Sequence, residues 1–339
     1  MRRVLFASMI ALALPAQAQT SYQGLCDASG AAALDERTFA VVSDELHAKK
    51  KDGGVDKLFI YERDKPQPVG EVDLNKFLNN GAKPPGEADL EGIARLGDRL
   101  YVIGSHANAK RKKDEPAQAK PERKVFFALD MAQKDGKWTF TPAGSTPVRT
   151  LLDGLKGNPN IAAYELGEAM KLPPDEEDGF NIEGLAALPE GKLAIGLRNP
   201  IPDEMALLLI LANPDKVLAG EPAKFDDPIE LDLGKRGIRA MHWTGKEMLI
   251  VAGPYDDGED AAYARDFALF RWSGKADDPV TEIKSVAVNS IRPEAITLFA
   301  DGRSGLLLSD DGDEKVAGQD CKDLPQAKRS FRTLSFTLE

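Results

Sequence analysis

Four charged residues stand at the same place in a phrase that recurs along the chain. Glu91 and Glu183 precede glycine in the phrases DLEGIA and NIEGLA, and Arg239 and Glu294 hold the charged place in two later copies. If the copies converge, Glu91, Glu183 and Glu294 could hold a hard divalent cation, Ca²⁺ or Mg²⁺, because such ions prefer oxygen ligands. The alternative is an Arg–Glu network without a metal, since none of these spacings is diagnostic for a metal site.

The same residues could carry out acid–base chemistry on an ester or lactone. A carboxylate such as Glu183 could act as a general base, and Arg239 or Arg198 could stabilise an oxyanion. Of the three histidines, His106 is the best candidate for a base. Ser105 directly before it is not thereby its nucleophile, because neighbouring side chains of a strand point to opposite faces.

A second set of polar residues follows the next strand of each copy and is expected to surround the same central opening. Arg198 and Arg236 could bind a carboxylate or phosphate group through paired hydrogen bonds. Ser105, Asp310 and Asp311 are expected beside them. Salt bridges to neighbouring acids are the alternative use of these arginines.

Repeated strands must position these residues. Five copies of the phrase are each followed by an apolar strand, and these strands are separated by 61, 93, 56 and 57 residues, counted between Phe39, Leu100, Leu193, Leu249 and Leu306. Periods of roughly 40–60 residues with short strands and glycine turns are typical of propeller blades. Since each copy offers about four short strands, the sequence predicts an all-β propeller of five blades.

Two segments interrupt this rhythm and leave the blade number open. Residues 107–124 are charged and lack an apolar period, which predicts a solvent-exposed insertion loop. Residues 160–170 have helical spacing before two prolines and predict a short surface helix. A sixth blade is the alternative, built from the segment between Trp138 and Leu152.

The two cysteines, Cys26 and Cys321, lie near opposite ends of the chain. In an oxidising compartment an even number of cysteines favours a disulfide. Such a bond would bring the chain ends together, and the alternating strand at residues 331–338 would close the ring, so that no sheet edge stays open. We therefore expect residues 19–339 to form a single propeller domain.

The first 18 residues predict export. Arg2 and Arg3 precede a short apolar run that ends in Ala16-Gln17-Ala18, the pattern of a secretory signal peptide cleaved after Ala18. The apolar run is shorter than the ~20 residues of a membrane-spanning helix. We expect a periplasmic or secreted monomer without a membrane span. A formal net charge of −11 disfavours nucleic acid as a partner.

Several phrases in order resemble the bacterial domain-of-unknown-function 3616 family over nearly the whole mature chain: DLEGIA (89–94), NIEGLA (181–186), GLR (196–198), RGIR (236–239), AGP (252–254) and SDDG (309–312). The resemblance implies a secreted, β-propeller-like protein with no established activity. More distantly, the E-G-[IL]-A phrase is similar to that of phytase-like esterases and gluconolactonase-type propellers, some of which hold an axial divalent cation with acidic residues. Glu91, Glu183 and Glu294 would be the matching acids, and Arg239 replaces one more.

Two functions of different classes stay open. The first is a hydrolase that acts on a small anionic ester or lactone at the central mouth, with Ca²⁺ or another divalent cation as its cofactor. The second is a non-catalytic periplasmic module that binds a small ligand or serves as a scaffold, in which the same charges form a structural network. The fold by itself does not choose between them.

Overall fold

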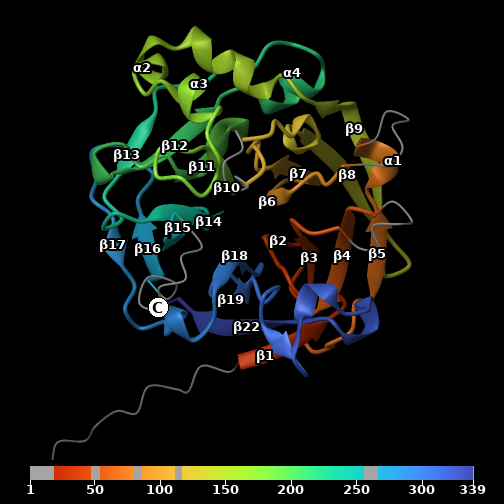
Figure 1. The fold of residues 1–339 in the computed structure, drawn as a ribbon. Helices are drawn as coiled ribbons and strands as arrows, with labels where there is room; N and C mark the ends of the chain where they lie inside the picture. The colour runs from red at the N-terminus through yellow and green to blue at the C-terminus, as the bar shows by residue number, and fades with distance from the viewer. Residues whose placement is uncertain (1–18, 47–53, 79–85, 111–116, 256–265, 339) are drawn as a thin grey trace, which may run out of the picture.

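Five β-sheets form a ring around a central axis (Figure 1). The structure is a computed structural model that describes residues 19–46, 54–78, 86–110, 117–255 and 266–338. Each of the five sheets has four antiparallel strands and makes one blade. The protein is therefore an all-β, five-bladed propeller, as the spacing of the repeats predicts.

The first four blades run in chain order from the axis outward. The first contains β2 (Gly30–Ala33), β3 (Thr38–Val42), β4 (Lys57–Glu62) and β5 (Gly70–Asp73). The second contains β6 (Leu90–Leu96), β7 (Arg99–Gly104), β8 (Phe126–Lys134) and β9 (Lys137–Val148). The third contains β10 (Asn181–Ala187), β11 (Leu193–Asn199), β12 (Ala206–Leu211) and β13 (Ile229–Leu231). The fourth contains β14 (Gly237–Trp243), β15 (Met248–Gly253), β16 (Ala268–Trp272) and β17 (Thr281–Glu282).

The fifth blade combines both ends of the chain. Its strands, from the axis outward, are β18 (Pro293–Leu298), β19 (Ser304–Ser309), β22 (Ser330–Thr337) and β1 (Gln19–Gln23). The C-terminal strand was predicted, and the structure adds that the N-terminal strand β1 pairs antiparallel with it as the outermost strand. A short hairpin, β20 (Lys315–Val316) and β21 (Gln319–Asp320), lies between β19 and β22 in the chain.

Two features hold the ring closed. The predicted disulfide joins Cys26 to Cys321 across 295 residues, with their Cα atoms 5.9 Å apart. The ring of Tyr22 in β1 stacks on Phe331 in β22, with centroids 5.6 Å apart, and meets Phe39 of the first blade edge-on at 5.3 Å. The aromatic cluster between the fifth and first blades therefore adds apolar burial to the covalent closure.

The six-blade alternative is wrong. Trp138 belongs to β9, which pairs with β8 as the outer strand of the second blade. The long interval before the third blade holds a helical insertion outside the ring (Figure 1), made of η3 (Leu151–Gly157), α2 (Pro159–Ala162) and α3 (Leu166–Ala169). The surface helix predicted at residues 160–170 is thus two short helices, separated at Glu165 by a left-handed backbone conformation with φ of 48°. Two further short helices are α1 (Asn75–Leu78) and α4 (Pro214–Leu218).

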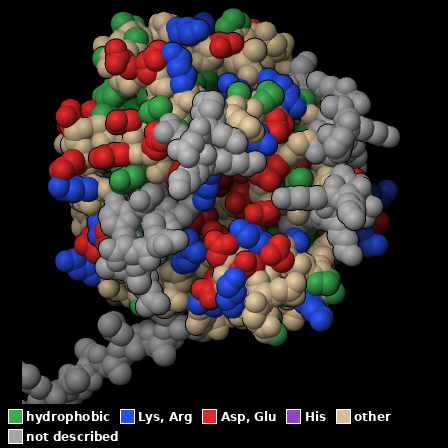
Figure 2. Space-filling view, viewed as in Figure 1, with side chains coloured by type: hydrophobic (Ala, Val, Ile, Leu, Met, Phe, Trp, Pro, Cys, Tyr) green, Lys and Arg blue, Asp and Glu red, His purple; other side chains and the backbone are tan. Residues whose placement is uncertain are grey.

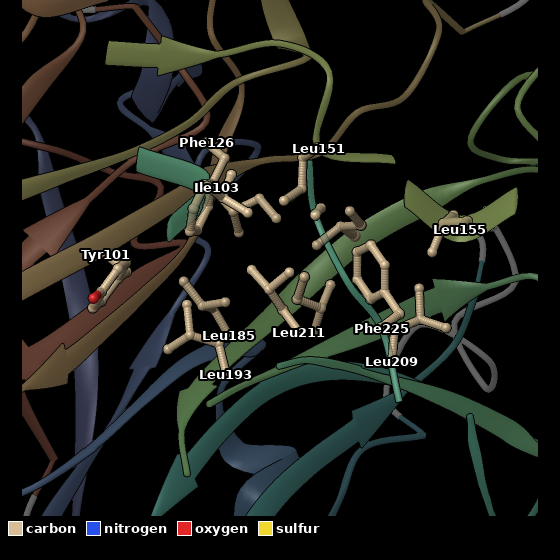
Figure 3. Close-up of a cluster of buried hydrophobic side chains, with 14 of the residues drawn as sticks. Tyr101, Ile103, Phe126, Leu151, Leu155, Leu185, Leu193, Leu209, Leu211 and Phe225 are labelled. Atoms are coloured by element: carbon tan, nitrogen blue, oxygen red, sulfur yellow. The ribbon is translucent and has the colours of Figure 1, made fainter. Parts of the chain in front are cut away.

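Hydrophobic clusters lie between adjacent blades. Figure 3 shows the cluster between the second and third blades, in which Ile103 and Phe126 share a core with Leu185 and Leu209. Since both faces of an inner sheet are covered by neighbouring blades, its strands are apolar throughout, and all six residues of β12 are buried.

The recurring phrase is the site of a β-bulge in four innermost strands. The strand register shifts at Glu91 in β6, Glu183 in β10, Arg239 in β14 and Glu294 in β18, so each of these residues lacks a partner across the ladder. The first blade lacks the charged residue, and β2 pairs with β3 without a shift. A bulge re-aims a side chain. This explains how strands packed on both faces can still present a charge to the axis.

The glycine of the phrase is required by the next blade. A Cβ atom on Gly92 would lie 2.6 Å from Cβ of Leu185, and one on Gly184 would lie 2.9 Å from Cγ2 of Ile238. Both distances are shorter than carbon atoms tolerate. The Glu-Gly pair therefore combines a re-aimed charge with a close approach between blades.

Some predictions concern parts that the structure does not describe or does not test. The signal peptide, residues 1–18, lies outside the described residues. Within the described residues, no helix has the length and apolar character needed to cross a membrane.

Candidate functional site

One mouth of the ring opens into a charged cavity of about 420 Å³. Figure 2 shows acidic side chains gathered at the central opening, with basic ones beside them. The carboxylates that line the cavity are Asp27, Asp44, Glu45, Glu87, Asp89, Glu91, Glu183, Glu294, Asp310 and Asp313. The cations that line it are Lys110, Lys120, Arg123, Arg198, Arg239, Arg292 and Lys322.

One side of the cavity is a closed Arg–Glu network. Glu183 lies 2.9 Å from Nη1 of Arg198 and 2.7 Å from Nε of Arg239. Arg239 also binds Glu294 and donates to the carbonyl oxygen of Pro254 at 2.9 Å. Its side chain is only 3% exposed. Buried ion pairs of this kind persist when hydrogen bonds satisfy the remaining donors, and both guanidinium groups are therefore committed to the protein itself.

The proton affinity of Glu294 is raised inside this network. Burial raises its pKa to about 8, an effect that the nearby Arg239 guanidinium only partly offsets. At neutral pH the Glu294 carboxyl group therefore exists in both protonation states. A group with such a pKa is suited to accept and release a proton.

The other side of the cavity is a carboxylate cluster formed by Asp44, Asp89 and Glu91. Ligand oxygen atoms of the three lie within 4.8 Å of one another. Ser105 donates a hydrogen bond to Asp89, and Nη1 of Arg123 lies 2.9 Å from it, while Asp44 accepts from a serine hydroxyl at 3.0 Å. Glu91 is only 8% exposed, and no hydrogen bond or ion pair reaches it from the described residues.

Burial and mutual repulsion make this cluster costly in the ionised state. Burial raises the pKa of Glu91 well above its usual range, and the charges of Glu183, Asp89 and Asp44 raise it further. Burial likewise raises the pKa of Asp44. A proton or a bound cation at this cluster would compensate the negative charge and so remove the free-energy cost of burying ionised carboxylates.

A carboxyl pair beside the disulfide completes the wall. Asp27 follows Cys26 directly, and its backbone forms a β-bridge with Asp310. Burial raises the pKa of Asp27 to about 11, with further contributions from the charge of Asp310 and a hydrogen bond between the two side chains. Asp27 therefore carries a proton at neutral pH, and the disulfide fixes this pair at the cavity.

The structure brings together six of the residues singled out in the sequence. These are Glu91, Glu183, Arg198, Arg239, Glu294 and Asp310, which all line the central cavity. The predicted metal set of Glu91, Glu183 and Glu294 does not form one cluster, because arginines hold Glu183 and Glu294. Glu91 clusters with Asp44 and Asp89 instead.

Four other candidates lie off the cavity. Arg236 pairs with Asp266 at 2.5 Å, and Asp311 is buried against Arg332 at 2.6 Å, so both are structural ion pairs. Ser105 is fully buried behind Asp89 and orients that carboxylate.

The prediction that His106 lies at the central mouth is wrong. This residue lines a separate cavity away from the axis. Its backbone has a φ of 56°, a left-handed conformation that interrupts the alternation of side chains after β7.

Several residues of the cavity were not identified from the sequence. Asp27 and Lys322 each flank a cysteine, and this adjacency to the predicted disulfide is the signal that could have indicated them. Arg123 lies in the segment predicted as a solvent-exposed insertion. That prediction is wrong for Ala107 and Asn108, which are buried, whereas the described residues 117–124 are exposed or half-buried as predicted. The middle, residues 111–116, lies outside the described residues.

A match to a family model identifies the family of this chain. The model of the family described as "Protein of unknown function (DUF3616)" matches residues 27–136 and 143–303, which together are most of the chain. The chain belongs to the DUF3616 family. All four bulge residues of this DUF3616 protein fall inside the matched ranges, whereas Cys321 and β22 lie beyond them.

Comparisons with individual proteins give no relative from which an activity follows. No curated protein is significantly similar to the chain in sequence. Among solved structures, a GH43 protein from Bacillus licheniformis is 12% identical with a TM-score of 0.45, covering 85% of this chain and 50% of that one. A sialidase from Trypanosoma rangeli is 12% identical with a TM-score of 0.40, covering 84% of this chain and 43% of that one. This chain thus spans less than half of the sialidase, and no conclusion about activity follows from either likeness.

Proposed function

We propose that this chain is an exported, cation-dependent hydrolase that acts on a small anionic ester or lactone at the central mouth. The supporting observation is the buried Glu91 carboxylate, which lies beside Asp44 and Asp89 without a hydrogen bond or ion pair from any described residue. Carboxylates this close repel one another unless a proton or a cation compensates their charge.

The donor set suits Ca²⁺ first. Asp44, Asp89 and Glu91 would hold the ion through carboxylate oxygens. Asn181 lines the same cavity, and its buried side-chain oxygen lacks a hydrogen-bond partner among the described residues. Ca²⁺ and Mg²⁺ take oxygen ligands, and Ca²⁺ accepts irregular arrangements more readily. A set of oxygen donors without histidine or cysteine disfavours most transition metals.

In this proposal the cation and the residues Glu294 and Arg239 have different roles in the reaction. A bound cation supplies Lewis acidity toward a substrate carbonyl group or a water molecule. In hydrolysis, the oxygen of water adds to the carbonyl carbon, the acyl C–O bond breaks, and a proton from the water passes to the leaving oxygen. Glu294 would carry that proton, because its pKa of about 8 allows both acceptance and release near neutral pH. Arg239 holds Glu294 in position.

The proposed negative charge of the substrate rests on the basic residues of the lining. Arg198 and Arg239 are committed to Glu183 and to backbone carbonyls, so they are poor candidates for gripping a substrate. Arg123 and Lys322 also have acidic partners, Asp89 and Asp313. They would attract an anionic group together with the other basic residues of the lining, Lys110, Lys120 and Arg292.

Calorimetric titration tests the cation. We expect the mature chain to bind Ca²⁺ with a dissociation constant of about 10⁻⁵ to 10⁻³ M, the range from sensor to extracellular sites. Glu91→Gln should abolish the binding heat, and Glu282→Gln on the outer strand β17 serves as the control that keeps it. Absence of binding heat in the wild-type protein would refute the cation site.

Turnover tests the reaction. A panel of lactones and carboxylate esters should be hydrolysed in Ca²⁺ and not after chelation. Glu294→Gln should retain Ca²⁺ binding but lose turnover, since the amide cannot carry the proton. Turnover unaffected by both Glu294→Gln and chelation would sink this mechanism.

A non-catalytic binding or scaffold module is the second candidate. A buried network of ion pairs favours this second candidate. It joins Glu183, Arg198, Arg239 and Glu294. Because these groups bind one another, few of their hydrogen-bonding groups are left to stabilise a transition state. Ca²⁺ binding combined with no turnover of any panel substrate is the result that would support this alternative.

A further inference from the structure

A second cavity, of about 510 Å³, lies away from the axis under the helical insertion. Its walls come from His106, from the residues flanking β8 and β9, and from η3, α2 and α3. None of the described residues lines both this cavity and the central one. Its volume falls in the range of small-molecule sites, roughly 300–1,000 Å³. We call it the insertion cavity.

One wall of the insertion cavity is apolar. The side chains that form it project from the three helical segments of the insertion and belong to, or pack against, the core between the second and third blades. They are Leu152, Leu155, Ile161, Leu166 and Met170. Such a wall accommodates an aliphatic chain or a ring.

The rest of the lining carries an excess of positive charge. Among the described lining residues, Lys124, Arg149, Lys156 and Lys171 face two acids, Asp153 and Glu165, on a chain whose formal net charge is −11.

Two of these cations are already committed. Lys171 is bound to Glu168 at 2.6 Å, and Arg149 donates to the backbone oxygen of Pro121 at 2.9 Å. Within the described parts of the chain, no ion pair is formed by Lys124 or Lys156. These two lysines are therefore the ones that can bind a ligand anion.

A buried polar residue also lines the insertion cavity. His106 is 2% exposed, and its Nε2 atom has no hydrogen-bond partner among the described residues. Burial lowers the pKa of the imidazole to about 3, so the ring is neutral at physiological pH.

The Nε2 atom of His106 suits a hydroxyl group of a ligand. A neutral imidazole carries one N–H, on either nitrogen, so Nε2 can donate or accept a hydrogen bond. A hydroxyl group has one donor and two acceptor lone pairs, and therefore matches Nε2 in either tautomer.

We propose that the insertion cavity binds a small amphipathic hydroxycarboxylate. Its apolar chain packs against Leu155, Ile161 and Leu166, its carboxylate pairs with Lys124 and Lys156, and its hydroxyl group forms a hydrogen bond with Nε2 of His106. This site is independent of the central cavity, and its test does not depend on Ca²⁺ or on turnover.

Calorimetry with defined probes tests the proposal on the mature full-length chain. 3-Hydroxyoctanoate should bind about three- to tenfold more tightly than octanoate, the value of one net hydrogen bond. Octan-1-ol and inorganic phosphate should each bind at least tenfold more weakly than 3-hydroxyoctanoate, because one lacks the charge and the other lacks the apolar chain.

Variants separate the three contacts. Lys124→Gln with Lys156→Gln should weaken binding of both acids at least fivefold, whereas Lys246→Gln, an exposed lysine of the β14–β15 turn, should leave it unchanged. His106→Leu should erase the preference for the hydroxyl group and keep octanoate binding. If that buried substitution prevents folding, the lysine pair carries the test.

Three results would overturn the proposal. The first is no binding heat from 3-hydroxyoctanoate, and the second is unchanged affinity in the double lysine variant. The third is equal affinity for octan-1-ol or inorganic phosphate, which would mark a non-specific apolar or anion site.

Discussion

Replacement of Arg239 by methionine isolates the energetic role of the buried network. Arg239 lies between Glu183 and Glu294 and is 3% exposed. Methionine keeps much of the side-chain volume and removes the charge and all the donors. Glu183 retains Arg198 at 2.9 Å, but Glu294 loses the guanidinium that lowers its pKa.

The expected loss is large at alkaline pH. Breaking a buried pair by removing one partner costs about 3–5 kcal/mol, because the remaining charge stays buried. Glu294 can escape the penalty by taking up a proton, so the loss should be smaller at pH 5.5 than at pH 8.5. Combining Arg239→Met with Glu294→Gln removes the stranded charge and should recover most of the loss.

Urea unfolding at both pH values measures these differences. The control is Arg37→Met, which removes an equally short pair with Asp64 at 2.7 Å, in which the two side chains are 66% and 61% exposed. An exposed pair contributes about 0–1 kcal/mol. If Arg239→Met stays within about 1 kcal/mol of the wild-type protein at both pH values, the buried network does not have the role assigned to it.

Two further predictions concern proton linkage and ring closure. Glu294 has a folded pKa of about 8 against an ordinary value of 4.5, so the stability it contributes is present below pH 4.5 and lost as the pH rises through 8. The unfolding free energy of the wild-type protein should therefore fall, relative to Glu294→Gln, by roughly 3 kcal/mol between pH 5 and pH 8, and a constant difference would contradict the buried carboxyl. Replacing Cys26 and Cys321 together by serine should lower the unfolding free energy by about 3–5 kcal/mol, because the bond closes a loop of 295 residues. Reductant should reproduce the loss in the wild-type protein and do nothing to the double variant, and equal urea midpoints for the two proteins would contradict the closure.

The architecture could be predicted from the sequence because repetition carries it. The spacing of the apolar strands indicated five blades, and an even pair of cysteines near the chain ends indicated how the ring closes. The number of blades could not be decided from the sequence, because the segment from Trp138 to Leu152 could have formed a sixth blade. No local pattern shows that Trp138 belongs to the long strand β9 or that a helical insertion follows it. The pairing of β1 with β22 brings together residues more than 300 positions apart, which no local signal reports.

The site was predicted only where a repeat marks it. Glu91, Glu183, Arg239 and Glu294 share one place in the phrase, and the structure puts them in one cavity. What those charges bind could not be predicted, because whether a guanidinium grips a ligand or a neighbouring carboxylate depends on distances of an ångström.

His106 shows the second limit of sequence reasoning. Its place after a strand suggested the central mouth, and one left-handed backbone angle directs it elsewhere.

The bulges make the charge pattern of the axis separable from the fold. Because a bulge residue has no partner across the ladder, exchanging its side chain leaves the pairing of its strand intact. Glu91, Glu183, Arg239 and Glu294 are four such positions, whereas β2 of the first blade pairs without a bulge. Substitutions at these positions that keep the buried charges balanced can therefore change the ligand bound at the axis, while each blade keeps its strand pairing.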